Sequence, residues 1–510
     1  MIKTDNVIIL GGGSAGWMSA ATLIHRYPKK NITVIESPNV PITGVGESTL
    51  GQFNIWLQTL GIKDEDFMPY TDASYKLSIK FTDFYKKGET FHYPFGSYYR
   101  NDLSLGHCNW FFKYNKTNDD YANFLYPAMA LVNNNTITKN KDNVIPNFYF
   151  DGDTAYHFDA TKFAIWLREN YCKPRGVNHI VEDVTNIKTD DSGVVSLNGH
   201  KADLYFDCTG FKSILMKKLN VKFNSYNDLL PNNKAWATKV PYNDKERELE
   251  PYTNCTAIEN GWVWNIPIWD RIGTGYVYSD KYVSDDEALD EFKKHLDSKG
   301  LDHSQSEFKN IPMRIGLHED IFVKNVCAIG LSAGFIEPLE SNGLLTVHEF
   351  LMYLIYIMDR HNNLSSMDIL SFNRQCKKFF NEFTDFVAMH FSLSNRNDTK
   401  YWKDISKRDW LKLSKSDGIG HSIDSFMSFW DFFKEIYGIH CISTGMNYHG
   451  YSKLHIENCR RWNDTGSGQS ISQIDYENSK RDNLVIKWDL IAKEQSSLLT
   501  FLSDIHESKQ

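Results

Sequence analysis

The sequence predicts an α/β fold built on a mostly parallel β-sheet. Residues 7–10 form an apolar run that ends in a glycine turn, a helical period follows from Ser14 to Tyr27, and a second apolar run occupies residues 32–36. This order is typical of a βαβ unit. Two later apolar runs, 204–210 and 326–330, also end in glycine, as parallel strands do where they approach a ligand. Because these runs lie far apart along the chain, we expect other segments to be inserted between the strands.

Length and composition limit the class of protein. The 510 residues allow one large domain with insertions, or two to three ordinary domains. Aromatic-rich helical patterns dominate the last third of the chain. We therefore predict an interleaved core at 1–345 and a mainly helical region at 346–510 that contributes to the substrate site. The net charge of −8, without a basic run, argues against nucleic acid or an anionic membrane as a partner.

The cysteine pattern favours a reducing compartment. Eight cysteines are spread along the chain without a C-x-x-C pair, which argues against a zinc site and a disulfide framework. No targeting segment is visible at the N-terminus, and the apolar stretch 344–358 is shorter than the ~20 residues that span a membrane. We expect a soluble, cytoplasmic protein that acts on small molecules.

The glycine turn after the first strand matches the motif G-x-G-x-x-G. Gly11 permits the tight turn, Gly13 lets backbone N–H groups approach a pyrophosphate, and Gly16 lets the helix pack close to the strand. Glu36, at the end of the second strand, stands where a carboxylate binds a ribose hydroxyl. The pattern predicts a dinucleotide site, although it does not distinguish FAD from NAD(P), and a similar turn also occurs in unrelated α/β domains. The predicted contacts are Gly11, Gly13, Ser14, Ala15, Gly16 and Glu36.

Residues 76–84 alternate between apolar and polar side chains. Leu77, Ile79 and Phe81 share one face and Lys80 lies on the other, so the spacing predicts a single strand. On composition alone, a lysine on the polar face of a strand is exposed to solvent.

At this point the sequence resembles the flavin-dependent halogenases, the family of the tryptophan halogenases. The resemblance extends from the N-terminus to about residue 402, and its most specific part is W-x-W-x-I-P at 262–267. It implies an FAD-binding Rossmann-type domain, of the glutathione-reductase kind, with interleaved β-sheet insertions and a helical substrate-side C-terminal region. The matching blocks are Gly44–Thr49, Ala155–Ala160, Asp207–Phe211, Trp262–Pro267, Arg271–Tyr276 and Gly334–Ser341.

The resemblance also implies a reaction in two stages. Reduced FAD (FADH2), supplied by a flavin reductase, and O2 oxidise a halide to hypohalous acid, which then halogenates a small aromatic substrate at a separate site. A tryptophan wall fills the space beside the flavin and keeps the substrate away from it. The implied wall consists of Trp262, Trp264, Ile266 and Pro267, and the implied flavin contacts include Gly46, Glu47, Ser48, Val184, Leu331 and Leu344.

Two residues are assigned to the halogenation site by the same resemblance. Lys80 either donates a hydrogen bond to the hypohalous acid as an ammonium or is halogenated as a neutral amine, and the sequence leaves both open. Glu340 orients the oxidant or accepts the proton that the ring loses. Without the resemblance, Glu340 would be an acidic residue at the start of a helix, stabilised by the helix dipole.

Halide and substrate residues differ from those of the tryptophan-specific members. The resemblance assigns halide binding, whether of bromide, chloride or iodide, to the backbone N–H groups of Asn342 and Gly343, where the family usually has threonine at the first position. Tyr93 replaces a stacking histidine, whereas Phe95 is retained. The paired tyrosines that hold the amino acid fall on residues 439–440, which are isoleucine and histidine. We therefore expect an indole, a phenol or another electron-rich aromatic rather than free tryptophan.

Two alternatives remain open from the sequence. An FAD-dependent monooxygenase that hydroxylates an aromatic substrate would use the same glycine motif, but would form an oxygenated product without halide. A non-catalytic flavoprotein would keep the motif for structural reasons. The presence of Lys80 and Glu340 together argues against the second alternative.

Overall fold

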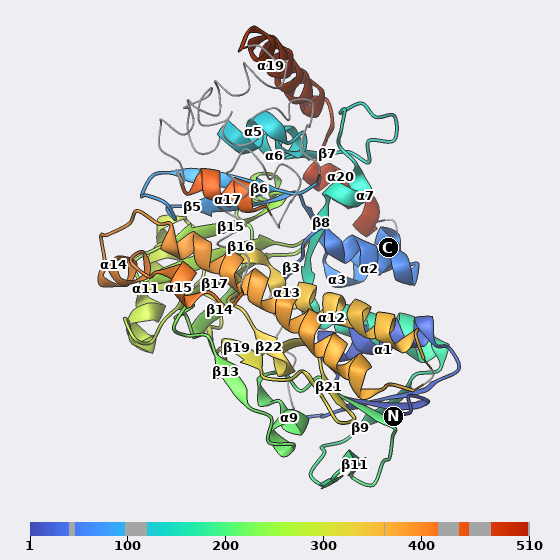
Figure 1. Ribbon diagram of the computed structural model, residues 1–510. Coiled ribbons are helices and arrows are strands. Elements are labelled where there is room, and N and C mark those ends of the chain that lie inside the picture. Colours follow the sequence, from blue (N-terminus) through green and yellow to red (C-terminus); the bar gives the residue numbers. More distant parts are fainter. Residues whose placement is uncertain (40–45, 97–119, 362, 417–437, 448–470, 508–510) are drawn as a thin grey trace.

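The computed structural model describes residues 1–39, 46–96, 120–361, 363–416, 438–447 and 471–507 (Figure 1). The expected sheet is present and has the strand order β20-β21-β12-β1-β2-β9. All neighbours are parallel except the edge pair β20 and β21. The four apolar runs that predicted this sheet are confirmed as strands of it. Its strands are β1 (Asn6–Leu10), β2 (Asn31–Glu36), β9 (Asn178–Val181), β12 (Leu204–Asp207), β20 (Phe322–Val323) and β21 (Val326–Ala328).

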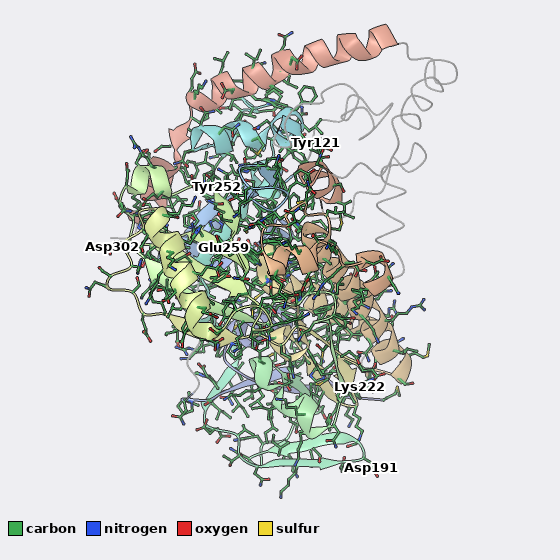
Figure 2. All side chains as sticks on the ribbon, turned by 90° about the vertical axis from the view of Figure 1, so that its left-hand side faces the viewer. Tyr121, Asp191, Lys222, Tyr252, Glu259 and Asp302 are labelled. Atoms are coloured by element: carbon green, nitrogen blue, oxygen red, sulfur yellow. The ribbon has the colours of Figure 1, made fainter. Side chains whose placement is uncertain are left out.

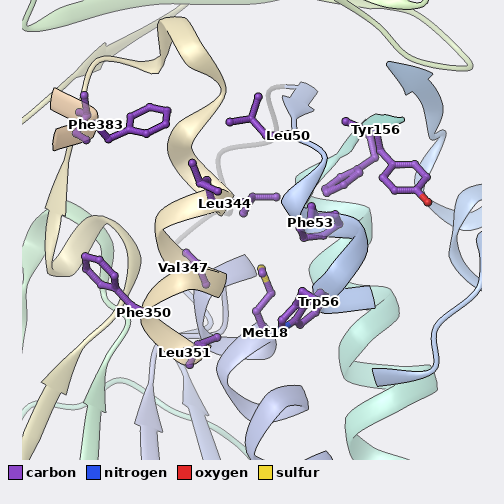
Figure 3. Packing of buried hydrophobic residues seen from close by; sticks show 14 of the residues in the cluster. Met18, Leu50, Phe53, Trp56, Tyr156, Leu344, Val347, Phe350, Leu351 and Phe383 are labelled. Atoms are coloured by element: carbon purple, nitrogen blue, oxygen red, sulfur yellow. The ribbon is translucent and has the colours of Figure 1, made fainter. Parts of the chain in front are cut away.

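Three helices beside this sheet pack on one another through buried apolar side chains. α1 (Ser14–Arg26) follows the glycine turn, α12 (Asn342–Met358) packs against α1, and α13 (Ser366–Ser392) packs against α12. α12 also contacts α2 (Gln52–Leu60). The start of α12 is therefore held in place by buried contacts on several sides. Figure 3 shows the side chains that meet there, among them Met18, Leu50, Phe53, Trp56, Leu344, Val347 and Leu351.

A second sheet is built from segments that lie between the strands of the first, which confirms the predicted interleaving. Its order is β18-β14-β17-β16-β15-β5-β6. All neighbours are antiparallel except β15 and β5. Its strands are β5 (Ser78–Thr82), β6 (Thr90–Pro94), β14 (Lys234–Val240), β15 (Tyr252–Ala257), β16 (Gly261–Pro267), β17 (Ile272–Tyr278) and β18 (Lys309–Pro312).

A small sheet, β3-β8-β4, contains Lys76, the first residue of the segment that was expected to be one strand over 76–84. It consists of β3 (Gly46–Ser48), β8 (Ala155–Asp159) and β4 (Ser74–Lys76). The chain leaves this sheet at Leu77, whose N–H donates to Pro251 O at 2.7 Å, and enters the large sheet as β5. Because the strand changes sheet, Lys76 and Lys80 do not share one face, and the single-strand prediction is wrong.

The remaining elements complete an elongated molecule. Figure 2 shows Tyr121 and Asp191 near its opposite ends. Within the described residues, no helix combines the length and apolar character needed to cross a membrane. α12 crosses the boundary predicted between residues 345 and 346. The other helices are α3 (Asp64–Thr71), α5 (Asp120–Leu125), α6 (Ala128–Asn134), α7 (Phe150–Asp153), α8 (Ala160–Trp166, continued by a π-helix at Leu167–Cys172), α9 (Ile214–Lys218), α10 (Lys245–Glu248), α11 (Asp285–Ser298), α14 (Lys400–Ile405), α15 (Trp410–Leu413), α17 (Ile439–Gly445), α19 (Ile471–Lys493) and α20 (Leu498–Glu507). The other strands are β7 (Thr136–Ile137), β10 (Ile187–Asp190), β11 (Gly193–Leu197), β13 (Phe223–Ser225), β19 (Gly316–His318), β22 (Gly334–Phe335) and β23 (Ser496–Ser497).

Candidate active site

The glycine turn has the geometry that a dinucleotide needs. Gly11 has a φ of +118°, and a Cβ there would lie 2.2 Å from Cys208 O. A Cβ at Gly16 would lie 1.9 Å from Gly11 O, so only glycine fits at these two positions. At Gly13, by contrast, no described heavy atom other than those of Gly13 and its two chain neighbours lies within 4 Å of the position that a Cβ would take. The turn thus leaves open space beside the N-terminus of α1, where a pyrophosphate fits.

Glu36 lies beside the same turn. Its Oε2 accepts a hydrogen bond from His179 Nε2 at 2.9 Å and lies 3.5 Å from Arg168 Nη1. A Cβ at Gly12 would lie 2.3 Å from Glu36 Cδ, so the carboxyl group reaches the turn. This position suits a carboxylate that binds a ribose hydroxyl.

The other expected flavin contacts lie around the start of α1 and α12. Leu331 belongs to a 3-10 turn, Gly330–Ser332, and a Cβ at Gly330 would lie 2.8 Å from Ala15 Cβ. Leu344 is buried in the first turn of α12, and Val184 is half-buried against the core after β9. Gly46, Glu47 and Ser48 form β3, and Ser14 Oγ donates to Ala160 O at 3.2 Å. Gly44 and Val45 of the matching block lie outside the described residues. The flavin-binding roles of all these residues stay predictions.

The tryptophans of the W-x-W-x-I-P motif lie on one face of β16, as its alternation predicts. The ring centroids of Trp262 and Trp264 are 6.1 Å apart, and Trp262 is only 1% exposed. Trp262 Nε1 donates to Glu337 Oε1 at 2.5 Å. Ile266 and Pro267 complete the strand and are buried as well. The orientation of Trp262 is thus fixed by a buried hydrogen bond in addition to packing.

Lys76, at the end of β4, is a lysine with no exposed surface. Its Nζ donates to Thr49 O at 3.0 Å and to Ser341 Oγ at 2.9 Å, and lies 4.8 Å from the centroid of the Phe95 ring. Burial lowers the pKa of Lys76 to about 7, while the charge of Glu340 acts in the opposite direction. Near neutral pH, the ammonium and amine forms of Lys76 therefore coexist.

Glu340 precedes α12 and is also fully buried. His390 Nε2, from α13, lies 2.6 Å from Glu340 Oε1. The other ring nitrogen, Nδ1, faces Phe386 O at 3.1 Å and must donate, because a carbonyl oxygen only accepts. Within the described residues, neither Glu340 oxygen nor His390 Nε2 makes a hydrogen bond of good geometry. Glu340 thus lies against a buried imidazole, within electrostatic range of Lys76.

Lys80 lies elsewhere, which corrects the expectation that it shares a site with Glu340. Its Nζ lies 5.5 Å from the centroid of the Tyr252 ring. In β5 it is Phe81 that faces His390, at 4.9 Å between ring centroids. Because neighbouring residues of a strand point to opposite faces, Lys80 points away from the His390 and Glu340 pair. The physical cause is the change of sheet at residue 77.

A cavity of about 710 Å³ lies beside Phe95. Both expected substrate residues, Tyr93 and Phe95, line it, and their ring centroids are 5.7 Å apart in an edge-on arrangement. The Phe95 ring also contacts the Lys76 ammonium, so it connects the cavity with the buried lysine. Ile439, at the start of α17, is buried, whereas the side chain of His440 lies outside what the structure describes. Other lining residues are Leu50, Gln52, Tyr126, Asp151 and Gly438.

The start of α12 offers backbone N–H groups next to a protonatable carboxyl group. Asn342 is buried, and its Nδ2 donates to Glu337 O at 2.8 Å. The atom nearest to a Cβ placed on Gly343 is Glu47 Oε2, at 3.6 Å. Burial, followed by the charge of Asp159, raises the pKa of Glu47 to about 7. A neutral Glu47 would leave the N-terminus of α12 favourable for an anion.

The fold and these features define a class: an α/β protein with a dinucleotide turn and a second, buried site containing a lysine and a glutamate. The sequence model described as tryptophan halogenase matches residues 6–450. The chain belongs to the tryptophan halogenase family, whose members are flavin-dependent enzymes. The resemblance seen in the sequence is confirmed.

Individual relatives agree with this assignment. The chain is 34% identical over 434 residues to the tryptophan 6-halogenase SttH of Streptomyces toxytricini, covering 79% of this chain and 81% of the relative. It is 32% identical over 450 residues to the tryptophan 7-halogenase RebH of Lentzea aerocolonigenes, covering 83% and 82%. Among solved structures, the apo structure of VirX1 superposes with a TM-score of 0.87 at 37% identity, covering 98% of this chain and 99% of that one.

Several residues of this site were not predicted from the sequence. Lys76 stands four positions before Lys80 in the same alternating segment, and the sequence gives no sign that the strand changes sheet between them. His390 follows Phe386 by one helical turn. A histidine on a helix face that is otherwise aromatic was the sequence feature that could have indicated a buried polar contact. Glu337 lies in a matching block, but its bond to Trp262 joins residues 75 positions apart.

Proposed function

We propose that this protein uses FADH2, O2 and a halide to halogenate an electron-rich aromatic substrate, with Lys76 and Glu340 at the halogenation site. The observation that carries the proposal is the buried Lys76, which lies against the Phe95 ring of the cavity and within electrostatic range of Glu340. This replaces the assignment of the role to Lys80.

Two properties of Lys76 support its role. Thr49 O and Ser341 Oγ accept two of its hydrogens, so one remaining position faces away from both partners. As an ammonium, this position donates a hydrogen bond to hypohalous acid and makes the halogen more electrophilic; as an amine, it presents a lone pair. Because its pKa is about 7, Lys76 reaches either form at little cost.

Glu340 supplies the complementary function. Attack of an aromatic carbon on the halogen of hypohalous acid forms the carbon–halogen bond and breaks the halogen–oxygen bond. The hydroxide that leaves takes a proton to become water, and the ring then releases its own proton. Glu340 is proposed to accept the ring proton. His390, whose Nε2 lies 2.6 Å from Glu340 Oε1, is proposed to stabilise the protonated carboxyl group. Both groups are buried, so the proton is retained at the site during the reaction.

The cofactor assignment rests on the fit of the glycine turn. Gly11 and Gly16 keep α1 close to β1, Gly13 leaves room for the pyrophosphate, and Glu36 reaches the ribose position. When bound, FADH2 with O2 and halide supplies the hypohalous acid. Halide is proposed to bind at the N–H groups of Asn342 and Gly343, in the first turn of α12. A separate flavin reductase is the proposed source of FADH2.

The substrate is proposed to be an indole, a phenol or a similar aromatic that enters the cavity at Phe95. Tyr93 and Phe95 provide aromatic faces for it. Ile439 is buried and apolar where tryptophan-specific members are expected to carry a polar ring, so free tryptophan is a poor candidate.

The test supplies FAD, a flavin reductase, NADH and one halide at a time to a panel of indoles and phenols, with tryptophan included, and detects products by mass spectrometry. We expect a halogenated product that depends on halide. A hydroxylated product formed without halide would instead favour the monooxygenase alternative, and the absence of any halogenated product would reject the proposed activity.

A matched pair of variants tests the site. Lys76→Met is expected to abolish halogenation while FAD still binds. Lys80→Met makes the same replacement on β5, the next strand along the chain, and should keep most of the activity. If the two variants behaved in the opposite way, the assignment of Lys76 would be refuted.

A further inference from the structure

A continuous chain of buried hydrogen bonds connects Lys76 to His157. Lys76 Nζ donates to Ser341 Oγ at 2.9 Å, and Ser341 Oγ donates to Ser48 Oγ at 3.1 Å. Ser48 Oγ lies 2.8 Å from Thr253 Oγ1, which lies 2.9 Å from His157 Nε2. None of these five side chains is more than 7% exposed, so water does not substitute for any link. The five side chains come from five separate segments of the sequence.

The far end of the chain fixes its direction. His157 Nδ1 lies 3.2 Å from Pro267 O, the carbonyl of the W-x-W-x-I-P proline. A carbonyl oxygen only accepts, so Nδ1 carries the hydrogen. If the ring is neutral, Nε2 is then an acceptor and Thr253 must donate to it. Ser48 must in turn donate to Thr253, and every link points from Lys76 toward His157.

Burial keeps the histidine neutral. His157 has no exposed surface, and this burial, together with the nearby charge of Lys76, holds the pKa of His157 well below its ordinary value. Ser74 Oγ also donates to Pro267 O, at 2.6 Å, so the carbonyl at the end of the chain is held in place. A neutral ring with a fixed tautomer thus terminates the chain.

We propose that His157 is a positioning residue that acts through Thr253 and Ser48. It forces the Ser341 hydroxyl to accept a hydrogen bond from Lys76, so that the third position on Lys76 Nζ is the one directed at the halogenation site. This inference rests on the proposed function, because it concerns how the halogenating lysine is prepared. It assigns a positioning role at the halogenation site to Ser48, Thr253 and His157.

The consequence concerns the two forms of Lys76. With both Thr49 O and Ser341 Oγ accepting, two hydrogens of Lys76 are always engaged, in the ammonium and in the amine. Gain or loss of the third hydrogen then occurs only at the position that faces the site. If the chain were cut, the Ser341 hydroxyl would be free to donate to the Lys76 lone pair, which would favour the amine and remove the lone pair from the site.

The charged and titratable groups around Lys76 come from several elements. Glu340, before α12, raises its pKa, and so does Cys255 of β15 to a smaller extent. His390 of α13 contacts Glu340, and His157 of β8 feels the charge of Lys76. A variant that cuts the chain at a hydroxyl leaves all of these groups in place, so its effect on Lys76 is separable from theirs.

The first experiment measures the tautomer of His157 in the wild-type protein without cofactor, by ¹⁵N NMR of the imidazole nitrogens, with the signal assigned by its loss in His157→Gln. We expect the neutral Nδ1–H form throughout pH 6 to 9. A ring protonated at Nε2 would make Thr253 an acceptor, reverse the last link and overturn the proposal.

The second experiment follows the titration of Lys76 itself, through the ¹³Cε signal of labelled lysine assigned by Lys76→Met. Thr253→Val removes the hydroxyl with little change of shape, and Thr253→Ser keeps it. We expect the Lys76 midpoint to fall by about one pH unit in Thr253→Val and in Ser48→Ala, and to stay near the wild-type value in Thr253→Ser. Equal midpoints in Thr253→Val and in the wild type would refute the chain.

Activity then separates the two proposals. In Thr253→Val, the limb of the halogenation pH profile that reports the titration of Lys76 should move to lower pH together with the Lys76 midpoint. In Thr253→Ser, this limb should lie at the wild-type pH. If Lys76→Met still halogenated, the proposed function of Lys76 would fail even with the NMR results as expected. If Lys76→Met were inactive but the chain variants left both midpoint and profile unchanged, only the role of the chain would fail.

Discussion

Replacing Lys76 by methionine tests the energetic cost of the buried lysine as well as its chemistry. The pKa of Lys76 is about 7, compared with 10.5 for an exposed lysine. At ~1.4 kcal/mol for each pH unit, burying the ammonium form costs on the order of 5 kcal/mol below pH 7. Methionine has a similar length and carries no charge. It leaves Thr49 O and Ser341 Oγ without their donor, which costs ~1–3 kcal/mol.

The sign of the effect depends on pH. Between pH 7 and 10.5 the unfolded chain binds more protons than the folded one, because the folded-state pKa is the lower of the two. The stability of the wild type therefore rises with pH over this range, and the cost of the charge disappears near pH 10.5. We expect Lys76→Met to be ~2–4 kcal/mol more stable than the wild type at pH 6, which is the relieved cost of the charge less the lost hydrogen bonds, and less stable at pH 10.

The assay is the thermal unfolding midpoint of the cofactor-free protein at pH 6 and pH 10, with Lys80→Met measured alongside. Lys80 is partly exposed, so its replacement should change the midpoint little and equally at both pH values. If Lys76→Met lowered the midpoint by the same amount at pH 6 and pH 10, Lys76 would not be buried as a charge, and the reasoning would be refuted.

Three further changes test other parts of the site. The halide KM of the wild type should rise as the pH increases through about 7, because Glu47 becomes charged beside Gly343, and Glu47→Gln should remove this rise; an unchanged slope would place the halide elsewhere. Trp262→Phe removes the donor to Glu337 and should increase the hydrogen peroxide formed per NADH while halogenation persists, whereas complete loss of halogenation with FAD bound would contradict the wall role. Glu340→Gln should slow halogenation by about 10²-fold and leave flavin affinity, measured by titration, nearly constant; the reverse pattern would make Glu340 structural.

The glycine turn and its surroundings were predictable because their signals are local. A turn, a strand end and a helix start lie within 36 residues of the N-terminus, and Gly11 and Gly16 leave no room for a side chain. The same holds for Trp262 and Trp264, which share a face through alternation alone. Tyr93 and Phe95 were proposed as substrate residues by resemblance, and the structure places both at the cavity.

The buried site of Lys76 and Glu340 was not predictable in the same way. Lys76 and Lys80 lie in one alternating segment, and only the change of sheet at Leu77 sends Lys76 into the interior and Lys80 to the other side. His390 meets Glu340 across 50 positions of sequence. Such contacts depend on how sheets and helices pack, and neither periodicity nor motif spacing encodes that.

The sequence by itself determined the interleaved α/β fold, the dinucleotide turn and the tryptophan strand, since hydrophobic period and glycine geometry act over a few neighbouring residues. Tertiary structure decided which lysine is buried, which carboxyl group it faces, and that Ser341, Ser48, Thr253 and His157 form one directed chain. The physical reason is that burial shifts a pKa and hydrogen bonds orient hydroxyl groups only once segments far apart in the sequence exclude water together.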